Sequence, residues 1–152
     1  MRLSVQAGRW GMRVAYAGLR TYWFLLRPEI VGVKCILTDG DDLLLVRHTY
    51  GNRAWDLPGG VVRRHEAPRH TATREMTEEL GRRFEDWVDL GELFIDTNHH
   101  HDNLHLFQVR VSDRSLDLNL VELSEAGWFP RDALPPDLAR YVLPILSRVK
   151  PA

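Results

Sequence analysis

The most informative stretch of the chain runs from Trp55 to Arg82 and reads WDLPGGVVRRHEAPRHTATREMTEELGR. It begins with a turn that contains a glycine pair and continues into a segment of helical character. On a helix, Glu75, Glu78 and Glu79 stand at positions i, i+3 and i+4 and therefore share one face. Like charges at this spacing repel each other, so the pattern indicates that a cation neutralises this face.

A hard divalent cation is the simplest way to neutralise the three carboxylates. Mg²⁺ accepts carboxylate and water oxygens in an octahedron and often binds a few carboxylates together with substrate phosphates. The glycine pair Gly59–Gly60 allows close approach of the backbone, so a glycine carbonyl can add a neutral oxygen ligand. Taken alone, such a triplet is also compatible with plain surface charge, relieved in part by Arg74 four residues before Glu78.

The full spacing of the stretch resembles the Nudix box of the Nudix hydrolases. It reads Gly60-x5-Glu66-x7-Arg74-Glu75-Met76-x-Glu78-Glu79-x-Gly81, with every glycine, glutamate and arginine of that pattern in place. Arg82 departs from the pattern, which has an aliphatic residue there. The rest of the chain, from about Val31 to the C-terminus, resembles a Nudix domain more loosely.

This resemblance implies an α/β Nudix fold, a mixed β-sheet flanked by the acidic helix on one side and a C-terminal helix on the other. An extra N-terminal helix is added to it. The implied activity is hydrolysis of a diphosphate bond in a nucleoside diphosphate linked to another moiety, with Mg²⁺ or Mn²⁺ as cofactor. The alternative is a non-catalytic Nudix-fold domain that binds or senses nucleotides.

The resemblance also implies roles for the residues of the box. Glu78 and Glu79 are the main metal ligands, helped by the Gly59 carbonyl and by Glu66. Glu75 is a further ligand and orients or deprotonates the attacking water. The implied catalytic residues are Arg74, Glu75 and Glu78, with Arg74 fixing a glutamate by ion pairing.

Residues outside the box are candidates for substrate contact. Arg47 and His48 end a predicted strand near the box, and Arg53 adds local positive charge, so these three are expected to hold a diphosphate. The alternative for Arg47 and His48 is an ordinary polar strand end. Asp102 and Glu122 are candidates for an acidic group that assists from outside the box.

The substrate is expected to be a small-molecule nucleotide. Nudix enzymes that act on ADP-ribose often have a proline where Thr97 stands here, and those for dinucleoside polyphosphates often have a tyrosine where Asn98 or His99 stands. Because neither marker is present, a nucleoside triphosphate or a nucleotide sugar fits the sequence.

Length, charge and cysteine content bear on the number of domains, the class of partner and the expected location. A chain of 152 residues predicts one domain, and 20 basic against 21 acidic residues give no general attraction to nucleic acid. Cys35 is the only cysteine, so an internal disulfide is impossible. Because no signal-peptide core or membrane-length apolar run is visible, the expected location is cytoplasmic.

The segment from about Ser4 to Arg27 is predicted to be helical and is followed by Pro28. Its arginines are spaced by four or seven residues and so form one stripe: Arg2, Arg9, Arg13, Arg20 and Arg27. Three interpretations stay open. The helix packs on its own domain or a homodimer partner with the arginines toward solvent, lies on an anionic membrane, or contacts nucleic acid. The chain is therefore divided into an accessory helix, 1–30, and a Nudix domain, 31–152.

Hydrophobic patterns predict the other elements. The expected strands are Val31–Leu37, Asp42–His48, Trp87–Ile95, Leu104–Val111, a short Leu116–Leu120 and a late strand at Gly127–Pro130. A last helix is expected to open at Pro135–Pro136 and to kink at Pro144.

A histidine-rich loop is expected before the strand that begins at Leu104. Its histidines, with one just beyond, are His99, His100, His101 and His105. Three successive histidines do not share one ion without contortion of the backbone, and no cysteine is near. A polar loop that touches substrate is therefore favoured over a transition-metal site.

Overall fold

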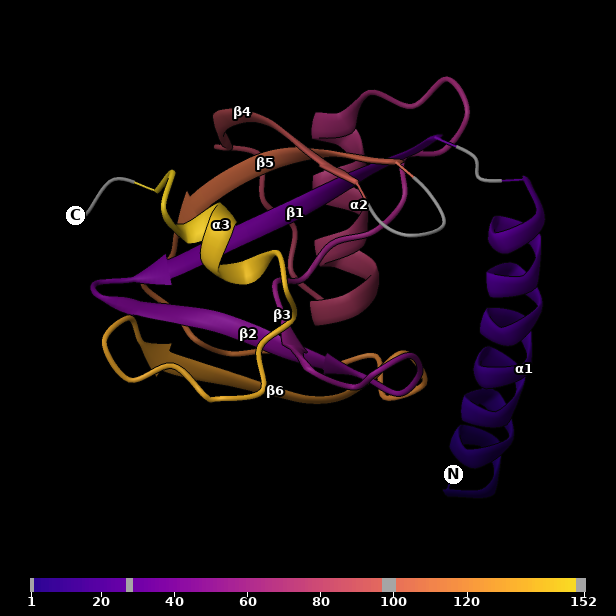
Figure 1. Ribbon diagram of the computed structural model, residues 1–152. Coiled ribbons are helices and arrows are strands. Elements are labelled where there is room, and N and C mark those ends of the chain that lie inside the picture. The colour runs from indigo at the N-terminus through magenta and orange to yellow at the C-terminus, as the bar shows by residue number, and fades with distance from the viewer. Residues whose placement is uncertain (1, 27–28, 97–100, 150–152) are drawn as a thin grey trace.

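Six strands and three helices make up the part of the chain that the computed structural model describes, residues 2–26, 29–96 and 101–149. In chain order they are α1 (Arg2–Leu26), β1 (Glu29–Asp39), β2 (Asp42–His48), β3 (Trp55–Asp56), α2 (Pro68–Leu80), β4 (Val88–Asp96), β5 (His101–Arg110), β6 (Leu123–Pro130) and α3 (Val142–Leu146). Figure 1 shows α2 behind the sheet, α3 in front of it and α1 at its side. The expected α/β fold with flanking helices and an added N-terminal helix is confirmed.

The sheet is mixed, and a hairpin joins its two parts. β1 and β2 are linked by a two-residue turn in which Gly40 has a φ of 58°, the left-handed conformation that such turns require. The strands pair next to this turn and then diverge. β1 continues in parallel pairing with β5, which pairs with β4, whereas β2 pairs antiparallel with β6 and β3.

Most strand predictions are confirmed. Those at Val31–Leu37, Asp42–His48, Trp87–Ile95 and Leu104–Val111 correspond to β1, β2, β4 and β5, and Gly127–Pro130 lies within β6. The short strand predicted at Leu116–Leu120 is wrong. There the amides of Asp117 and Asn119 donate to the carbonyls of Leu80 and Glu79, at 2.9 Å each. These are end-of-helix carbonyls without helical partners, so the segment completes the end of α2 instead of adding a strand.

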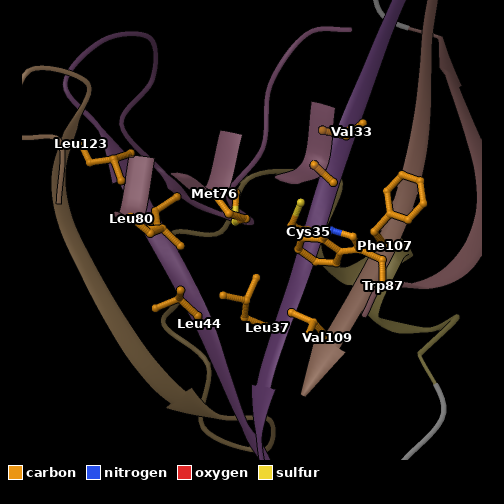
Figure 2. Packing of buried hydrophobic residues seen from close by; sticks show 12 residues of the cluster. Val33, Cys35, Leu37, Leu44, Met76, Leu80, Trp87, Phe107, Val109 and Leu123 are labelled. Carbon is orange, nitrogen blue, oxygen red and sulfur yellow. The ribbon is translucent and has the colours of Figure 1, made fainter. Parts of the chain in front are cut away.

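The two faces of the sheet build two apolar clusters, one under α2 and one under α3. In β2, Leu44 and Val46 pack on the α2 side, whereas Leu43 and Leu45 pack on the α3 side. Each fully buried leucine stabilises the fold by about 1.5–3 kcal/mol. Figure 2 shows the cluster on the α2 side, which includes Val33, Cys35, Leu37, Met76, Leu80, Trp87, Phe107, Val109 and Leu123. α2 is thereby fixed against β1, which positions its acidic residues.

The C-terminal helix begins later than predicted. The segment after Pro135–Pro136 pairs with β3, since Trp55 donates its amide to Asp137 and accepts from the Ala139 amide, at 2.8 and 2.7 Å. The predicted kink at Pro144 is also wrong. Pro144 is the third residue of α3, where an amide has no helical acceptor to lose.

Two arginines of α1, Arg9 and Arg13, contact the domain, whereas the expectation was that the arginines face solvent; Arg13 and Arg20 are nevertheless exposed. The Arg9 Nε donates to the Leu120 carbonyl at 2.8 Å, and the Arg13 Nε donates to the Thr49 carbonyl at 3.3 Å. Both contacts use loops next to the ends of β2 and β6, where Figure 1 places α1. The physical reason is that these loop carbonyls lack strand partners and accept from long guanidinium side chains.

The outer side of α1 carries apolar side chains. Trp10 and Val14 are 66% and 67% exposed, and Leu19 and Tyr22 are also open to solvent. None of the helices in the described ranges is both long and apolar enough to cross a membrane.

Candidate active site

The glycine pair lies along β1, in a loop that continues the sheet. The amides of Cys35 and Val33 donate to the carbonyls of Pro58 and Gly60, at 2.9 and 2.8 Å. Alternate carbonyls of an extended segment point to the same side, so the Gly59 carbonyl points away from β1. No hydrogen bond within the described part of the chain ends on that carbonyl, which leaves it free to act as a ligand.

Neither glycine position has room for a Cβ atom. Gly59 has a φ of 147°, and a Cβ there would lie 2.2 Å from the Val33 carbonyl oxygen. A Cβ on Gly60 would lie 2.4 Å from the Glu75 Cδ. The backbone therefore approaches the acidic helix as closely as it does because neither residue has a side chain.

The helix α2 buries two of the three predicted carboxylates. Its apolar positions, Met76 and Leu80 among them, face the sheet and carry the neighbouring acids inward. Glu79 is 1% exposed and Glu75 is 9% exposed. By contrast, the side chain of Glu78 is 42% exposed.

Arg74 joins the acids of the box into one network. Its Nε and Nη2 donate to the two carboxylate oxygens of Glu66, at 2.8 and 2.9 Å. Its Nη1 donates to Glu75 at 2.5 Å and to Glu78 at 3.2 Å. The paired bonds from Arg74 lower the pKa of Glu66 to about 2. Glu66, Arg74, Glu75 and Glu78 are thus brought together, as their positions in the box imply.

The buried acids are short of positive charge. Burial raises the pKa of Glu79 well above its usual value, the charge of Glu75 adds to this, and Lys34 and the Gly59 amide offset only part of it. The Gly59 amide donates to the Glu79 carboxylate at 3.2 Å. Burial also raises the pKa of Glu75, in spite of its bond to Arg74. Like-charged neighbours in a buried place make this a site that gains by taking up a cation.

Glu122 belongs to the same cluster, although it lies far from the box in the sequence. Burial and the charge of Glu78 raise its pKa, and its own charge acts on Glu75 and Glu79. Its backbone is held by the Thr49 amide, which donates to the Glu122 carbonyl at 2.8 Å. The loop before β6 therefore carries an outside acid to the end of α2.

The chemistry of the donors fits a hard divalent cation, because carboxylate and carbonyl oxygens are what Mg²⁺ and Mn²⁺ prefer. Within the described ranges, no three acidic, histidine or cysteine side chains already converge as metal ligands. Arg74 forms ion pairs with Glu75 and Glu78 at 2.5 and 3.2 Å. The residues expected from the sequence to hold a cation are Gly59, Glu66, Glu75, Glu78 and Glu79.

A cleft of about 670 Å³ opens beside the glycine pair. Of the predicted contact residues, His48, Arg53 and Asp102 line it. Arg47 is not among the lining residues. Its guanidinium pairs with Asp137 at 2.7 Å and lies 4.7 Å over the Trp55 ring, which ties β2 to the C-terminal segment.

Lys34 is a cleft residue that the sequence analysis missed. Its Nζ lies 2.6 Å from Asp56 and donates to the Leu57 carbonyl at 3.0 Å. Burial lowers the pKa of Lys34, but Asp56, together with Tyr141 and Glu79, outweighs this and the net shift is upward. A lysine inside the apolar run Val31–Leu37 was the available signal, since a buried charge needs a partner.

The histidine-rich loop falls largely outside the described residues, which also leave out the substrate-marker positions Thr97, Asn98 and His99. His105 lies across from Glu92 in the β4–β5 pair, with its Nδ1 3.7 Å from the Glu92 carboxylate.

Comparison with known families identifies the domain. The sequence model of the NUDIX domain matches residues 28–148. The chain belongs to the Nudix family. A curated relative, the ADP-ribose pyrophosphatase of Mycobacterium tuberculosis, is 46% identical over 48 residues, which are 31% of this chain and 23% of that protein. The Nudix chain therefore spans less than a quarter of that relative's length.

Solved structures of Nudix proteins share the fold. The MutT NUDIX hydrolase from Burkholderia pseudomallei has a TM-score of 0.73 and 25% identity, covering 80% of this chain and 98% of that one. The MutT protein from Methanosarcina mazei Go1 has a TM-score of 0.70 and 23% identity, covering 81% and 94%. The NUDIX domain of Shewanella oneidensis NrtR, solved with ADP ribose, has a TM-score of 0.66 and 17% identity, covering 79% and 85%.

Proposed function

We propose that this Nudix protein is a divalent-metal-dependent pyrophosphohydrolase that cleaves the diphosphate bond of a nucleoside diphosphate linked to another moiety. The observation that carries the proposal is the buried acidic cluster of Glu75 and Glu79, which lies against Gly59–Gly60 at the side of a cleft. Buried carboxylates whose charge is only partly offset by neighbouring cations are unusual in a purely structural role, whereas a metal and phosphate site needs them.

The chain's own residues are assigned the following roles. Glu78 and Glu79, with the Gly59 carbonyl and Glu66, hold Mg²⁺ or Mn²⁺. Such an ion, when bound, neutralises charge on phosphate oxygens and makes water a stronger acid. Arg74 is a positioning residue, since it acts through the glutamates that it pairs with.

The proton of the attacking water is taken by an acidic residue of the cluster. Glu75 is the candidate inside the box, and Glu122 is the candidate outside it. Burial raises the pKa of both groups, which makes each a stronger base than an exposed carboxylate. Lys34 keeps positive charge in the cleft, where a diphosphate needs it.

The proposed substrate class includes nucleoside triphosphates, nucleotide sugars and ADP-ribose. The local identity to an ADP-ribose pyrophosphatase supports including ADP-ribose although the sequence marker for it is missing. His48, Arg53 and Asp102 are proposed substrate contacts because they line the cleft. The division into 1–30 and 31–152, the cytoplasmic location, and homodimer or membrane contact through α1 stay predictions.

The test is a hydrolysis screen of this substrate class with Mg²⁺, with Mn²⁺ and with chelator. Products are separated by chromatography, and water labelled with oxygen-18 shows which phosphorus is attacked. We expect metal-dependent release of a nucleoside monophosphate from at least one compound. Nucleotide binding by calorimetry without any hydrolysis would instead indicate a non-catalytic nucleotide-binding domain.

A further inference from the structure

The helix α1 lies outside the part of the chain matched by the family model, yet it is fitted to the mouth of the cleft. Arg9 and Arg13 bond to loop carbonyls, and a Cβ on Gly8 would lie 3.1 Å from a Val121 methyl carbon. These positions share one helical face with Tyr16 and Arg20, which lie three and seven residues after Arg13. One face of α1 thus both docks on the domain and points toward the cleft.

Tyr16 and Arg20 line the same cleft as the Gly59–Gly60 pair. The Tyr16 ring centroid lies 5.1 Å from that of Tyr50, which in turn lies 5.0 Å from the His48 ring. Three rings therefore run from α1 along the cleft wall.

Tyr50, in the middle of this run, feels the charge of the acidic cluster. Burial raises the pKa of the Tyr50 hydroxyl, and the charges of Glu79, Glu122 and Glu75 raise it further. Tyr50 thus contacts α1 through Tyr16 and lines the same cleft as Gly59 and Gly60, which lie against the proposed metal ligands. A molecule whose diphosphate sits at the acidic cluster has its remaining part within reach of this wall.

The charge of the cleft suits an anion. Lys34 is already paired with Asp56, whereas Arg20 and Arg53 form no ion pair with any residue in the described ranges. Guanidinium groups bind phosphate oxygens well because their donors match the geometry of the anion. Aromatic rings stack on nucleobases whatever the base, because every base has a π-face.

We propose that α1 is a wall of the substrate cleft, with Tyr16, beside Tyr50, stacking on the nucleobase and Arg20 pairing with phosphate oxygens. The inference rests on the proposed function, since it places the far end of the same substrate. On this proposal, α1 helps to select the substrate instead of only packing beside the domain.

Two non-hydrolysable probes separate the two contacts. Methylenediphosphonate carries a bridged diphosphate without a nucleoside, whereas α,β-methylene-ADP carries a similar diphosphate with a base and ribose. Binding of each to the full chain with Mg²⁺ is measured by calorimetry. We expect Tyr16→Leu to weaken binding of α,β-methylene-ADP by roughly tenfold and to leave binding of methylenediphosphonate unchanged. Tyr16→Phe, which keeps the ring, should bind both probes with wild-type affinity. Arg20→Gln is expected to weaken binding of both probes.

Matched controls are available away from the cleft. Tyr22, 52% exposed on α1, gives Tyr22→Leu, and Arg131, in the turn after β6, gives Arg131→Gln. Both controls should bind the probes like wild type, and thermal melts should show that every variant is folded.

The outcomes separate the two proposals. Wild-type affinity in Tyr16→Leu and Arg20→Gln, or no binding of either probe to wild type, would overturn the inference about α1. Equal loss for both probes in Tyr16→Leu would also overturn it, because a stacked base predicts selective loss. If the binding pattern holds but the hydrolysis screen finds no turnover, the role of α1 stands and the hydrolytic function fails.

Discussion

Gly60 lies so close to Glu75 that a Cβ atom on Gly60 would stand 2.4 Å from the Glu75 Cδ. The carboxylate occupies the space that a side chain at residue 60 would fill. The spacing between the glycine turn and the helix in the sequence thus places Gly60 and Glu75 in direct contact.

Gly60→Ala should therefore displace the Glu75 carboxylate and lower turnover by at least about tenfold, or about 1.4 kcal/mol of barrier. Its effect on folding should be small, because the neighbour that must move is the end of a side chain. Gly59→Ala is the informative comparison, since its Cβ would meet the Val33 carbonyl oxygen at 2.2 Å. It should destabilise the fold by about 2 kcal/mol or more, measured by denaturant unfolding. Equal stability losses in the two variants would contradict this distinction.

Arg74→Lys should lower turnover by about tenfold, because an ammonium group cannot reproduce the two parallel bonds to Glu66. The matched change is Arg83→Lys, which affects an ion pair with Glu85 whose side chains are 70% and 66% exposed. Exposed pairs contribute little, so Arg83→Lys should leave turnover and melting unchanged. An Arg74→Lys enzyme with wild-type turnover would show that this network has no positioning role.

His48 should make the fold sensitive to acid. Burial, and then the charge of Lys34, lower its pKa to about 4, whereas an unfolded histidine titrates near 6.5. Between these values only the unfolded state binds the proton, so the free energy of unfolding falls as pH drops from about 6.5 to about 4.

The measurement is the melting temperature of wild type and His48→Gln at pH 7 and pH 5. On acidification from pH 7 to pH 5, the melting temperature of wild type should fall more than that of His48→Gln. The buried glutamates have raised pKa values and act in the opposite direction, but they are present in both proteins and cancel in the difference. Parallel losses would mean that His48 is protonated in the folded state too.

Mg²⁺ or Mn²⁺ should raise the melting temperature, and chelator should remove the gain. A ligand that binds only the folded state stabilises it by about 2.7 kcal/mol at one hundred times its dissociation constant. Glu78→Gln and Glu79→Gln should each reduce the response to metal. Identical melts with millimolar metal and with chelator would show that the protein alone does not hold the ion.

The acidic helix and the hairpin could be predicted from the sequence because both are local patterns. The spacing of Glu75, Glu78 and Glu79 is a property of one helix, and Gly40 satisfies a two-residue turn by its own conformation. Burial of Glu79 could not be read in this way. It depends on how Met76 and Leu80 seat the helix on a sheet that is assembled from distant strands.

The errors arose where a segment bonds to a distant partner. Residues 116–120 have the composition of a strand, but Asp117 and Asn119 cap α2. The segment after Pro135 pairs with Trp55 before its helix can begin. Arg9 and Arg13 of α1 likewise donate to loop carbonyls, and these contacts leave no periodic signal in the sequence.

The most direct measurement is turnover of the best substrate by Glu79→Gln at saturating Mg²⁺, with Glu125→Gln on the exposed part of β6 as control. The amide keeps the shape of the side chain and can still accept from Gly59, but it removes the charge that a metal needs. We predict a loss of at least about 100-fold, or about 2.7 kcal/mol of barrier, with an unchanged or higher melting temperature. Near-wild-type turnover in Glu79→Gln would contradict the assignment of this acidic cluster as the catalytic centre.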